Sequence, residues 1–340
     1  MSRSKATVLT VASIAAVFAV LILGTGIGSV FIPPAHIIRV IANAVFGTPL
    51  GDDIPSSSVS IILSVRMPRV FLAFLVGAAL AVSGAAVQSV LKNPLASPFT
   101  LGTSSGASLG ASIVIAANVT VFGTFTLAFS GIIAAIITMF LMVSFAKKLD
   151  RSLQSSTVVL TGMVLSLFIS AIVSLIANIA DEKYKQIMKW QSGNFAGRGW
   201  SYTILLAVVL SVCFTIFMFN SRELDILTFG DEQAQTVGLD TGRSKALLLI
   251  LSAALSGTAV AFAGVIGFVD LIAPHIARKL FGAKHKLLLP MSAVTGGIFM
   301  VICDLIARTV IVPNELPVGV VTSLIGAPFF AYVYFRRRRS

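Results

Sequence analysis

Long runs of residues without a charged side chain dominate the chain, and polar residues gather in short segments between them. A helix needs about 20 consecutive apolar residues to cross the hydrocarbon core of a bilayer. Runs free of Asp, Glu, Lys and Arg that approach or exceed this length cover residues 6–38, 70–91, 93–146, 152–180, 199–221, 246–269, 287–303 and 316–335. The pattern therefore predicts an all-α polytopic membrane protein.

Two stretches are too long for a single crossing. Run 93–146 has 54 residues, and turn-forming residues between 118 and 123 divide it into two predicted helices. Residues 246–277 carry a single charged side chain and would form a helix of about 48 Å at ~1.5 Å per residue. We expect this segment to turn back around Gly264 to Gly267, and Pro274 to interrupt or start a second, short, partly buried helix.

The distribution of basic residues favours an even number of crossings. Both chain ends are basic, and cytoplasmic segments carry an excess of Lys and Arg. Ten crossings with both termini in the cytoplasm place 17 of the 25 Lys and Arg residues inside, and give a net charge of +11 inside against +1 outside. We therefore predict about ten transmembrane helices, cytoplasmic N- and C-termini and a single domain over residues 1–340. The longest loops are expected at 39–69 and 181–198 outside and at about 221–245 inside, with an interfacial helix at 35–46.

The composition agrees with a membrane protein. Hydrophobic residues make up 56% of the chain and charged residues 11%, against about 25% charged residues in soluble domains, and the mean hydropathy is +0.98. These values exclude an ordinary cytosolic enzyme and a disordered tail. The net charge of +12 does not indicate nucleic-acid binding, because the basic residues lie between apolar runs instead of forming one patch.

Motifs for catalysis and metal binding are absent from the sequence. It has no Gly-x-x-x-x-Gly-Lys-Ser/Thr phosphate loop, no His-Glu-x-x-His, no Ser-centred nucleophile elbow and no acid or histidine cluster with metal spacing. An intramembrane enzyme therefore lacks a catalytic set, and no metal site is expected. An ion-coupled secondary transporter is a weaker alternative, since only Asp270 and Asp304 are expected inside helices. Arg308, four residues after Asp304, can pair with it.

Two predicted helices carry small residues at a spacing of four. Gly102, Gly106 and Gly110 favour close packing against a neighbouring helix. The second stripe is more polar and either lines a water-filled pathway or packs against another helix. It comprises Gly162, Ser166, Ser170 and Ser174.

The predicted cytoplasmic loop contains the elements of two short helices. Gly230 can end the first, and Asp231 and Glu232 suit the first turn of the second, because acidic side chains favour a helix N-terminus. The apolar side of the second helix would consist of Ala234, Val237 and Leu239. A surface helix of this kind is either idle or a docking element.

Seven motifs occur in order along the chain: Arg66-Met-Pro-Arg69, Gly77-Ala-Ala-Leu-Ala-Val-Ser-Gly84, Lys92-Asn-Pro-Leu-Ala-Ser-Pro98, Leu101-Gly-Thr-Ser-Ser-Gly-Ala107, Gly230-Asp-Glu-Gln-Ala234, Gly264-Val-Ile-Gly-Phe-Val-Asp-Leu-Ile-Ala-Pro-His-Ile-Ala-Arg278 and Glu315-Leu-Pro-Val-Gly-Val-Val-Thr-Ser-Leu-Ile-Gly-Ala-Pro328. Together they resemble the permease subunits of the type II ABC importers for iron-siderophores, haem and cobalamin. The resemblance extends from about Gly28 to Tyr334.

The resemblance implies the type II ABC importer permease fold, in which two permease subunits enclose a central pathway. It also implies two cytoplasmic ATPase subunits, an extracytoplasmic substrate-binding protein and a multi-pass location in the bacterial plasma membrane. ATP and Mg²⁺ would bind to the ATPases, and this chain would bind no cofactor. The expected cargo is a ferric siderophore, with cobalamin or haem as the alternative.

The resemblance further implies roles for individual residues. Arg66, Arg69 and Arg308 match arginines that receive acidic residues of the binding protein, and the guanidinium fork suits a carboxylate. Anchoring to lipid headgroups is the alternative for these three. The segment that matches the ATPase-coupling helices contains Gly230, Asp231, Glu232, Ala234, Val237, Gly238 and Leu239. Asn93 and Leu95 match the cytoplasmic gate, and the stripe at 162–174 matches the pathway lining.

Asp270 departs from the family pattern, which usually has a small residue at this position. A buried carboxylate is costly unless it is paired. We therefore hypothesise that Asp270 is an internal partner for a nearby arginine.

Overall fold

The computed structural model describes residues 3–28, 30–51 and 53–337. Positions 1–2, 29, 52 and 338–340, which include Arg338 and Arg339 of the basic C-terminus, lie outside the described residues. All regular secondary structure within the described ranges is helical, as the sequence predicts. The longer helices are α1 (Arg3–Gly26), α2 (Pro34–Phe46), α4 (Met67–Val90), α5 (Thr103–Ala117), α6 (Thr126–Leu149), α7 (Ser155–Ile179), α9 (Trp200–Phe219), α12 (Thr241–Ala263), α13 (Val269–Phe281), α14 (His285–Thr309) and α15 (Val318–Arg337). The shorter ones are α3 (Ser56–Ser60), the π-helical turn η1 (Ile61–Arg66), η2 (Gly123–Phe125), η3 (Asp181–Lys183), α8 (Tyr184–Gln191), α10 (Ser221–Leu227) and α11 (Asp231–Thr236).

A helix is present at each of the ten predicted crossings. Seven segments of the described chain are long and apolar enough to cross a membrane: Val8–Gly26, Ser56–Val90, Gly123–Leu149, Ser155–Ile179, Trp200–Phe219, Thr241–Ala263 and His285–Thr309. The other three places hold α5 and α15, which have shorter apolar stretches, and α13, a helix of 13 residues that carries charged side chains. The number of complete crossings and their orientation in the membrane stay predictions.

Both predicted reversals of the chain are present. Helix α5 ends at Ala117, Asn118 adopts a left-handed conformation, and α6 begins at Thr126. Helix α12 ends before Gly264, whose φ of 78° is left-handed and favours glycine. The next helix, α13, already begins at Val269, so that Pro274 lies inside it.

Residues 39–69, which the sequence predicts as an outer loop, are instead largely helical. Helix α2 continues to Phe46, and Ser56–Val90 forms one continuous helical segment of 35 residues. Its π-helical turn ends just before Pro68. Proline has no N–H and its ring collides with the carbonyl four residues earlier in a regular α-helix, so the wider turn at this point has a physical cause.

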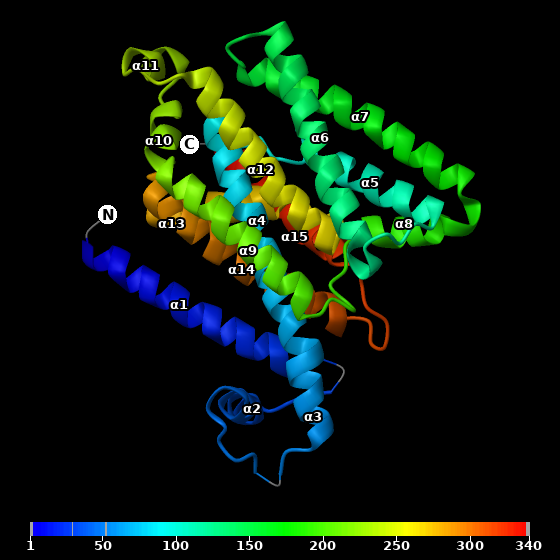
Figure 1. Cartoon of the computed structure of the whole chain (residues 1–340). Helices are drawn as coiled ribbons and strands as arrows, with labels where there is room; N and C mark the ends of the chain where they lie inside the picture. The colour runs from blue at the N-terminus through cyan, green and yellow to red at the C-terminus, as the bar shows by residue number, and fades with distance from the viewer. Residues whose placement is uncertain (1–2, 29, 52, 338–340) are drawn as a thin grey trace.

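Helix α4 lies at the centre of the bundle (Figure 1), with α1 on one side and α5 to α8 on the other. Every residue from Val76 to Leu91 is buried, and the main neighbours are α14, α12 and α13. A Cβ atom at Gly77 would collide with the carbonyl of Gly296, and one at Gly84 with that of Asp270. Glycine therefore permits the close approach of α4 to α14 and α13.

The small-residue stripe on α5 packs as predicted. Gly106 and Gly110 face α6, where added Cβ atoms would collide with Thr138 and with the carbonyl of Ser130. Gly102 precedes the helix and is left-handed.

Helix α1 begins, and α15 ends, toward the end of the molecule that carries α10 and α11, away from α2 and α3 (Figure 1). The two ends of the bundle thus hold different candidate sites. One end holds the arginines of α4 and α14, and the other holds the predicted coupling loop.

Candidate functional site

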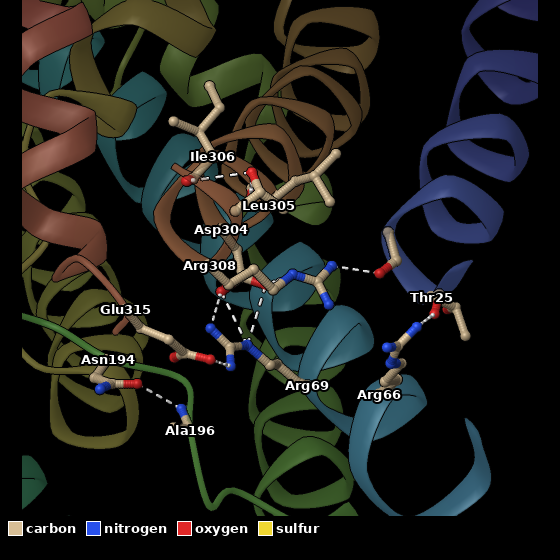
Figure 2. Close-up of polar contacts among 12 residues, drawn as sticks. Thr25, Arg66, Arg69, Asn194, Ala196, Asp304, Leu305, Ile306, Arg308 and Glu315 are labelled. Atoms are coloured by element: carbon tan, nitrogen blue, oxygen red, sulfur yellow. Dashed lines mark hydrogen bonds and ion pairs between the residues drawn. The ribbon is translucent and has the colours of Figure 1, made fainter. Parts of the chain in front are cut away.

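The three arginines expected at the outer surface meet where α1, α4 and α14 come together (Figure 2). Arg69 Nη2 lies 2.8 Å from Asp304 Oδ1, and its Nη1 lies 2.8 Å from Glu315 Oε1. The Asp304 side chain is fully buried, whereas 35% of the Glu315 side chain is exposed. Arg69 thus ties α4 to α14 and to the segment that leads into α15.

Arg308 and Arg66 bind the end of α1. Arg308 Nε lies 3.5 Å from Asp304 Oδ2, which confirms the predicted i,i+4 pair. A second nitrogen of Arg308 donates a hydrogen bond to the carbonyl of Gly24. Arg66 donates hydrogen bonds to three main-chain carbonyls, those of Thr25, Gly26 and Val30.

All three arginines are therefore buried and have partners inside the chain, with exposed fractions between 6% and 9%. We call Arg66, Arg69, Arg308, Asp304 and Glu315 the outer arginine cluster. Three cations face two carboxylates in it, so it keeps an excess positive charge. Glu315 is its most exposed member, and an acidic group from outside can compete with Glu315 for Arg69.

The sequence reasoning did not find the carboxylate partners of Arg69. Asp304 and Glu315 are separated from it by 235 and 246 positions. Spacing in the sequence indicates contacts between residues three or four positions apart on one helix, such as Asp304 and Arg308. It does not indicate contacts between residues that lie far apart along the chain.

A second feature is a pocket of about 440 Å³ between α5, α7 and α8. Three serines of the predicted polar stripe line it together with serines of α5: Ser166, Ser170 and Ser174 with Ser104, Ser105 and Ser108. Phe99, Tyr184 and Met188 add larger surfaces, and the residues that line the pocket include no charged side chain. The Ser104 hydroxyl is buried and has no hydrogen-bond partner within the described chain.

Gly162, the first residue of the predicted stripe, has a different position. A Cβ atom there would come within 2.7 Å of the Thr100 carbonyl and 2.8 Å of Leu101 Cα. Gly162 therefore permits a close contact between α7 and the segment before α5, while the three serines face the pocket.

The predicted coupling loop folds into α10 and α11. Gly230, with a φ of 126°, separates them, and Asp231 and Glu232 occupy the first turn of α11 as predicted. Ala234 is buried and Leu239 packs against the core, but Val237 is 66% exposed. Gly238 adopts a left-handed conformation just after α11. Phe229, before Gly230, is 74% exposed, and it was not singled out in the sequence.

Asp231 faces inward. Its Oδ2 lies 2.6 Å from Nζ of Lys245, which is fully buried, and its Oδ1 lies 3.5 Å from Nζ of Lys92. Lys245 also donates hydrogen bonds to the carbonyls of Ser152 and Leu153, between α6 and α7. Asp231 therefore holds α11 against the bundle, whereas Glu232 is exposed.

The predicted gate residues form a turn directly after α4. The Asn93 side chain accepts a hydrogen bond from the backbone N–H of Leu95, and Leu95 is 44% exposed. A pocket of about 590 Å³ lies between this turn and α7, and one of about 630 Å³ lies between α11 and the segment 152–156. The predicted gate turn thus lies beside the predicted coupling loop.

Asp270 has a serine as its side-chain partner, so the hypothesis of an arginine partner is wrong. Its carboxylate accepts a hydrogen bond from the Ser97 hydroxyl, and its carbonyl accepts one from Gln88 Nε2. Arg278 donates to Gln88 Oε1 instead, at 3.2 Å. Gln88 therefore connects the main-chain carbonyl of Asp270 to the Arg278 guanidinium.

Known proteins share this architecture. An uncharacterized ABC transporter permease protein, YvrB of Bacillus subtilis (strain 168), is 42% identical over 321 residues, which cover 94% of this chain and 91% of the relative. The Fe(3+)-citrate import system permease protein YfmE of the same organism is 37% identical over 335 residues, covering 97% and 96%. A solved ABC transporter assigned to the metal-chelate type, in an inward-facing conformation, matches with a TM-score of 0.82 at 29% identity and covers 96% of this chain and 99% of its own.

The profile of the FecCD transport family matches residues 14–336, nearly the whole chain. The match agrees with a multi-pass helical bundle that has no ATP-binding motif of its own. The chain therefore belongs to the FecCD transport family and is a permease subunit of a type II ABC importer.

Proposed function

We propose that this permease passes a ferric siderophore, or a related iron(III) chelate, across the bacterial plasma membrane. The serine-lined pocket is the observation that supports this most, because its hydroxyl, aromatic and thioether groups include no charged side chain. Such a lining contacts a bulky chelate weakly and does not compete for its metal, so the cargo can leave as well as enter. The relatives named for Fe(3+)-citrate and for iron(3+)-hydroxamate import also support an iron chelate.

A second permease subunit would complete the pathway. Helix α7 exposes a broad apolar side, including Leu167 at 71% and Phe168 at 65%, next to the serines that line the pocket. Lipid or a second permease chain can cover such a side. We place a second permease subunit, identical or related, against α7, so that two serine-lined pockets face one another.

A substrate-binding protein would dock at the outer arginine cluster. The cluster has an excess positive charge, and Glu315 is its exposed acid. An acidic side chain of the binding protein would displace Glu315 from Arg69 and form a bidentate pair. Arg66 and Arg308 then hold α1 in place and add to the positive potential at the docking surface.

Two ATPase subunits would supply the energy, and they bind ATP and Mg²⁺ while this chain binds neither. The surface offered to them comprises the exposed side chains around α11: Phe229, Glu232 and Val237. The inward side of the same helix, with Asp231 and Ala234, holds it to the bundle. One side of α11 thus packs against the bundle, and the other side is open to an ATPase subunit.

Uptake measurements in cells with and without this chain test the proposal. Radiolabelled ferric citrate, a ferric hydroxamate, haemin and cobalamin would be supplied in parallel. We expect iron-chelate uptake to be lost on deletion and restored by the gene. Loss of haemin or cobalamin uptake instead would overturn the iron chelate as cargo; relatives carry names for both.

A pair of variants tests the pathway itself. Ser170→Trp fills the serine-lined pocket and is expected to abolish uptake, whereas Ser211→Trp, on an exposed face of α9, is the matched control. Unchanged uptake in the Ser170 variant, with normal amounts of chain in the membrane, would show that the cargo does not pass this pocket.

A further inference from the structure

A chain of short polar contacts connects the coupling loop to the end of α4. His285, the first residue of α14, is 1% exposed. Its Nδ1 lies 2.6 Å from Asp225 Oδ1 on α10, and its Nε2 lies 2.6 Å from the hydroxyl of Ser89 on α4. The backbone N–H of His285 also donates to Asp225 Oδ1, at 2.9 Å. The imidazole therefore joins three helices through its two nitrogens.

The arrangement resembles a serine–histidine–aspartate triad in its connectivity, but its surroundings give it another role. Ser89 is 4% exposed and lies in the last two turns of α4, where its hydroxyl also contacts the carbonyl of Ala85. A nucleophile must be open to a substrate, and this hydroxyl is closed in by helices. The contact of His285 with Ser89 therefore serves to hold the helices in position relative to one another.

Ser89 lies four positions before the gate turn. Helix α4 ends at Val90, and Asn93 donates its backbone N–H to the carbonyl of Gln88 at 3.0 Å. A shift of the last turn of α4 is therefore passed to Asn93 and Leu95. Residues 76–91 are all buried. Because a protein interior is close-packed, this end of α4 can move only together with the residues packed against it.

The coupling loop contacts the same end of α4 a second time. Lys92, between α4 and Asn93, lies 3.5 Å from Asp231 at the start of α11. Helix α10 is further anchored by Leu224 and Leu227, which are fully buried. Both short helices of the coupling loop are thus connected to the segment that carries the gate.

We propose that His285 is a positioning residue that transmits movement of α10 to the end of α4 and so sets the gate turn at Asn93 to Leu95. The contact between His285 and Ser89 is buried, where a low dielectric strengthens a hydrogen bond, and networks of hydrogen bonds can carry coupling between sites. The inference rests on the proposed function, because it takes α10 and α11 as the elements that the ATPase moves.

The test uses the full complex of this permease with its ATPase in lipid nanodiscs. Leu95→Cys places a reporter thiol on the gate turn, where the native residue is 44% exposed, while the native Cys213 and Cys303 are buried. The rate of labelling by a charged maleimide is measured with and without ATP and vanadate. No cargo is required, so the result does not depend on its identity.

In the parent reporter we expect ATP to change the labelling rate by about fivefold or more, the usual size of a coupling between sites. His285→Ala should bring this ratio close to one while the ATPase still co-purifies and hydrolyses ATP. Ser89→Ala removes a single hydroxyl from the same set of contacts, and we expect it to abolish the ATP response as well. It provides the test if His285→Ala does not fold. Ser292→Ala is the matched control, since Ser292 lies buried on the same helix with no hydrogen-bond partner for its hydroxyl in the described chain.

A full ATP response in the Ser89→Ala reporter, or an equal loss in the Ser292→Ala control, would overturn the role of His285. A purified parent chain that binds no ATPase would instead overturn the proposed function and, with it, the role of His285. A parent complex that hydrolyses ATP but shows no change in labelling at Leu95→Cys would show that the turn at Asn93 to Leu95 is not the gate. The proposed role of His285 would then fail with that assignment. A contrary result in the Ser89→Ala or Ser292→Ala reporter leaves the proposed function standing. Failure of the role of His285 is therefore distinguishable from failure of the proposed function.

Discussion

Arg69 on α4 binds the carboxylate of Asp304 on α14, with 2.8 Å between Nη2 and Oδ1 and further hydrogen bonds from Nε. Asp304 is fully buried and also lies 3.5 Å from Arg308. A single carboxylate therefore compensates two guanidinium groups inside an apolar bundle. Removal of one partner from such a group leaves an unpaired buried charge, which costs far more than the loss of an exposed ion pair.

Asp304→Asn should consequently lower the stability of the chain by about 3–5 kcal/mol. Glu315→Gln, at a carboxylate that is 35% exposed, should lower it by about 1 kcal/mol or less. Thermal unfolding of the purified chain in detergent measures both variants. Equal unfolding temperatures for the two would contradict the central position of Asp304.

Glu315→Gln should also strengthen the binding of the substrate-binding protein. The substitution removes the internal competitor for Arg69 and adds to the excess positive charge of the outer arginine cluster. The gain should fade with added salt, since the Debye length falls from about 10 Å at 0.1 M to about 3 Å at 1 M. Titration of the binding protein against the permease in nanodiscs measures this.

The control for that titration is Glu182→Gln, which removes an exposed acid from the segment between α7 and α8. Weaker or unchanged docking in the Glu315 variant would argue against the exchange of carboxylates. Charge reversal of Arg69 is a poorer experiment, because it would place a glutamate beside the buried Asp304 and disturb folding.

Asp231 and Glu232 should separate folding from ATPase association. Asp231→Asn removes the charge that compensates the fully buried Lys245, so we expect a lower unfolding temperature. Glu232→Gln changes an exposed side chain, so we expect normal stability and less ATPase co-purified with the chain. If the two variants behave alike in both assays, the two sides of α11 do not have the separate roles assigned here.

Gly77→Ala should destabilise the contact between α4 and α14. The added Cβ would collide with the carbonyl of Gly296, a backbone atom that cannot turn away. Overpacking of this kind costs about 1–3 kcal/mol. Gly267→Ala, at a position with open space around the new Cβ, is the control for thermal unfolding. A Gly77 variant as stable as the control would show that the helices can separate without cost.

The positions of the helices could be predicted from the sequence, because the length of an apolar run limits how many crossings it holds. The division of residues 93–146 and the reversal at Gly264 both followed from this limit. The same logic failed at 39–69, where polar serines together with Arg66 and Arg69 concealed the start of a long helical segment at Ser56. Their charges are satisfied by residues far along the chain or by main-chain carbonyls, which no run length reveals.

Contacts within one helix were predictable and contacts between helices were not. The Asp304–Arg308 pair follows from helical spacing, and the structure contains it. The serine partner of Asp270 and the histidine link between α10 and α4 depend on how separate helices pack. Serine and histidine at those positions are unremarkable in the sequence, since nothing local distinguishes them from packing residues.

The hydrogen bonds that Arg66 makes to the end of α1 and the residues after it all go, among the described residues, to main-chain carbonyls, those of Thr25, Gly26 and Val30. Every residue type supplies such a carbonyl, so this anchor is indifferent to which side chains follow α1. It depends instead on the spacing of these carbonyls, because an insertion or a deletion between Gly26 and Val30 would move the third acceptor away from the first two. Side chains at Thr25 and Val30 can therefore change without loss of these bonds, whereas Gly28 is constrained, since an added Cβ there would lie 2.9 Å from an Arg66 nitrogen.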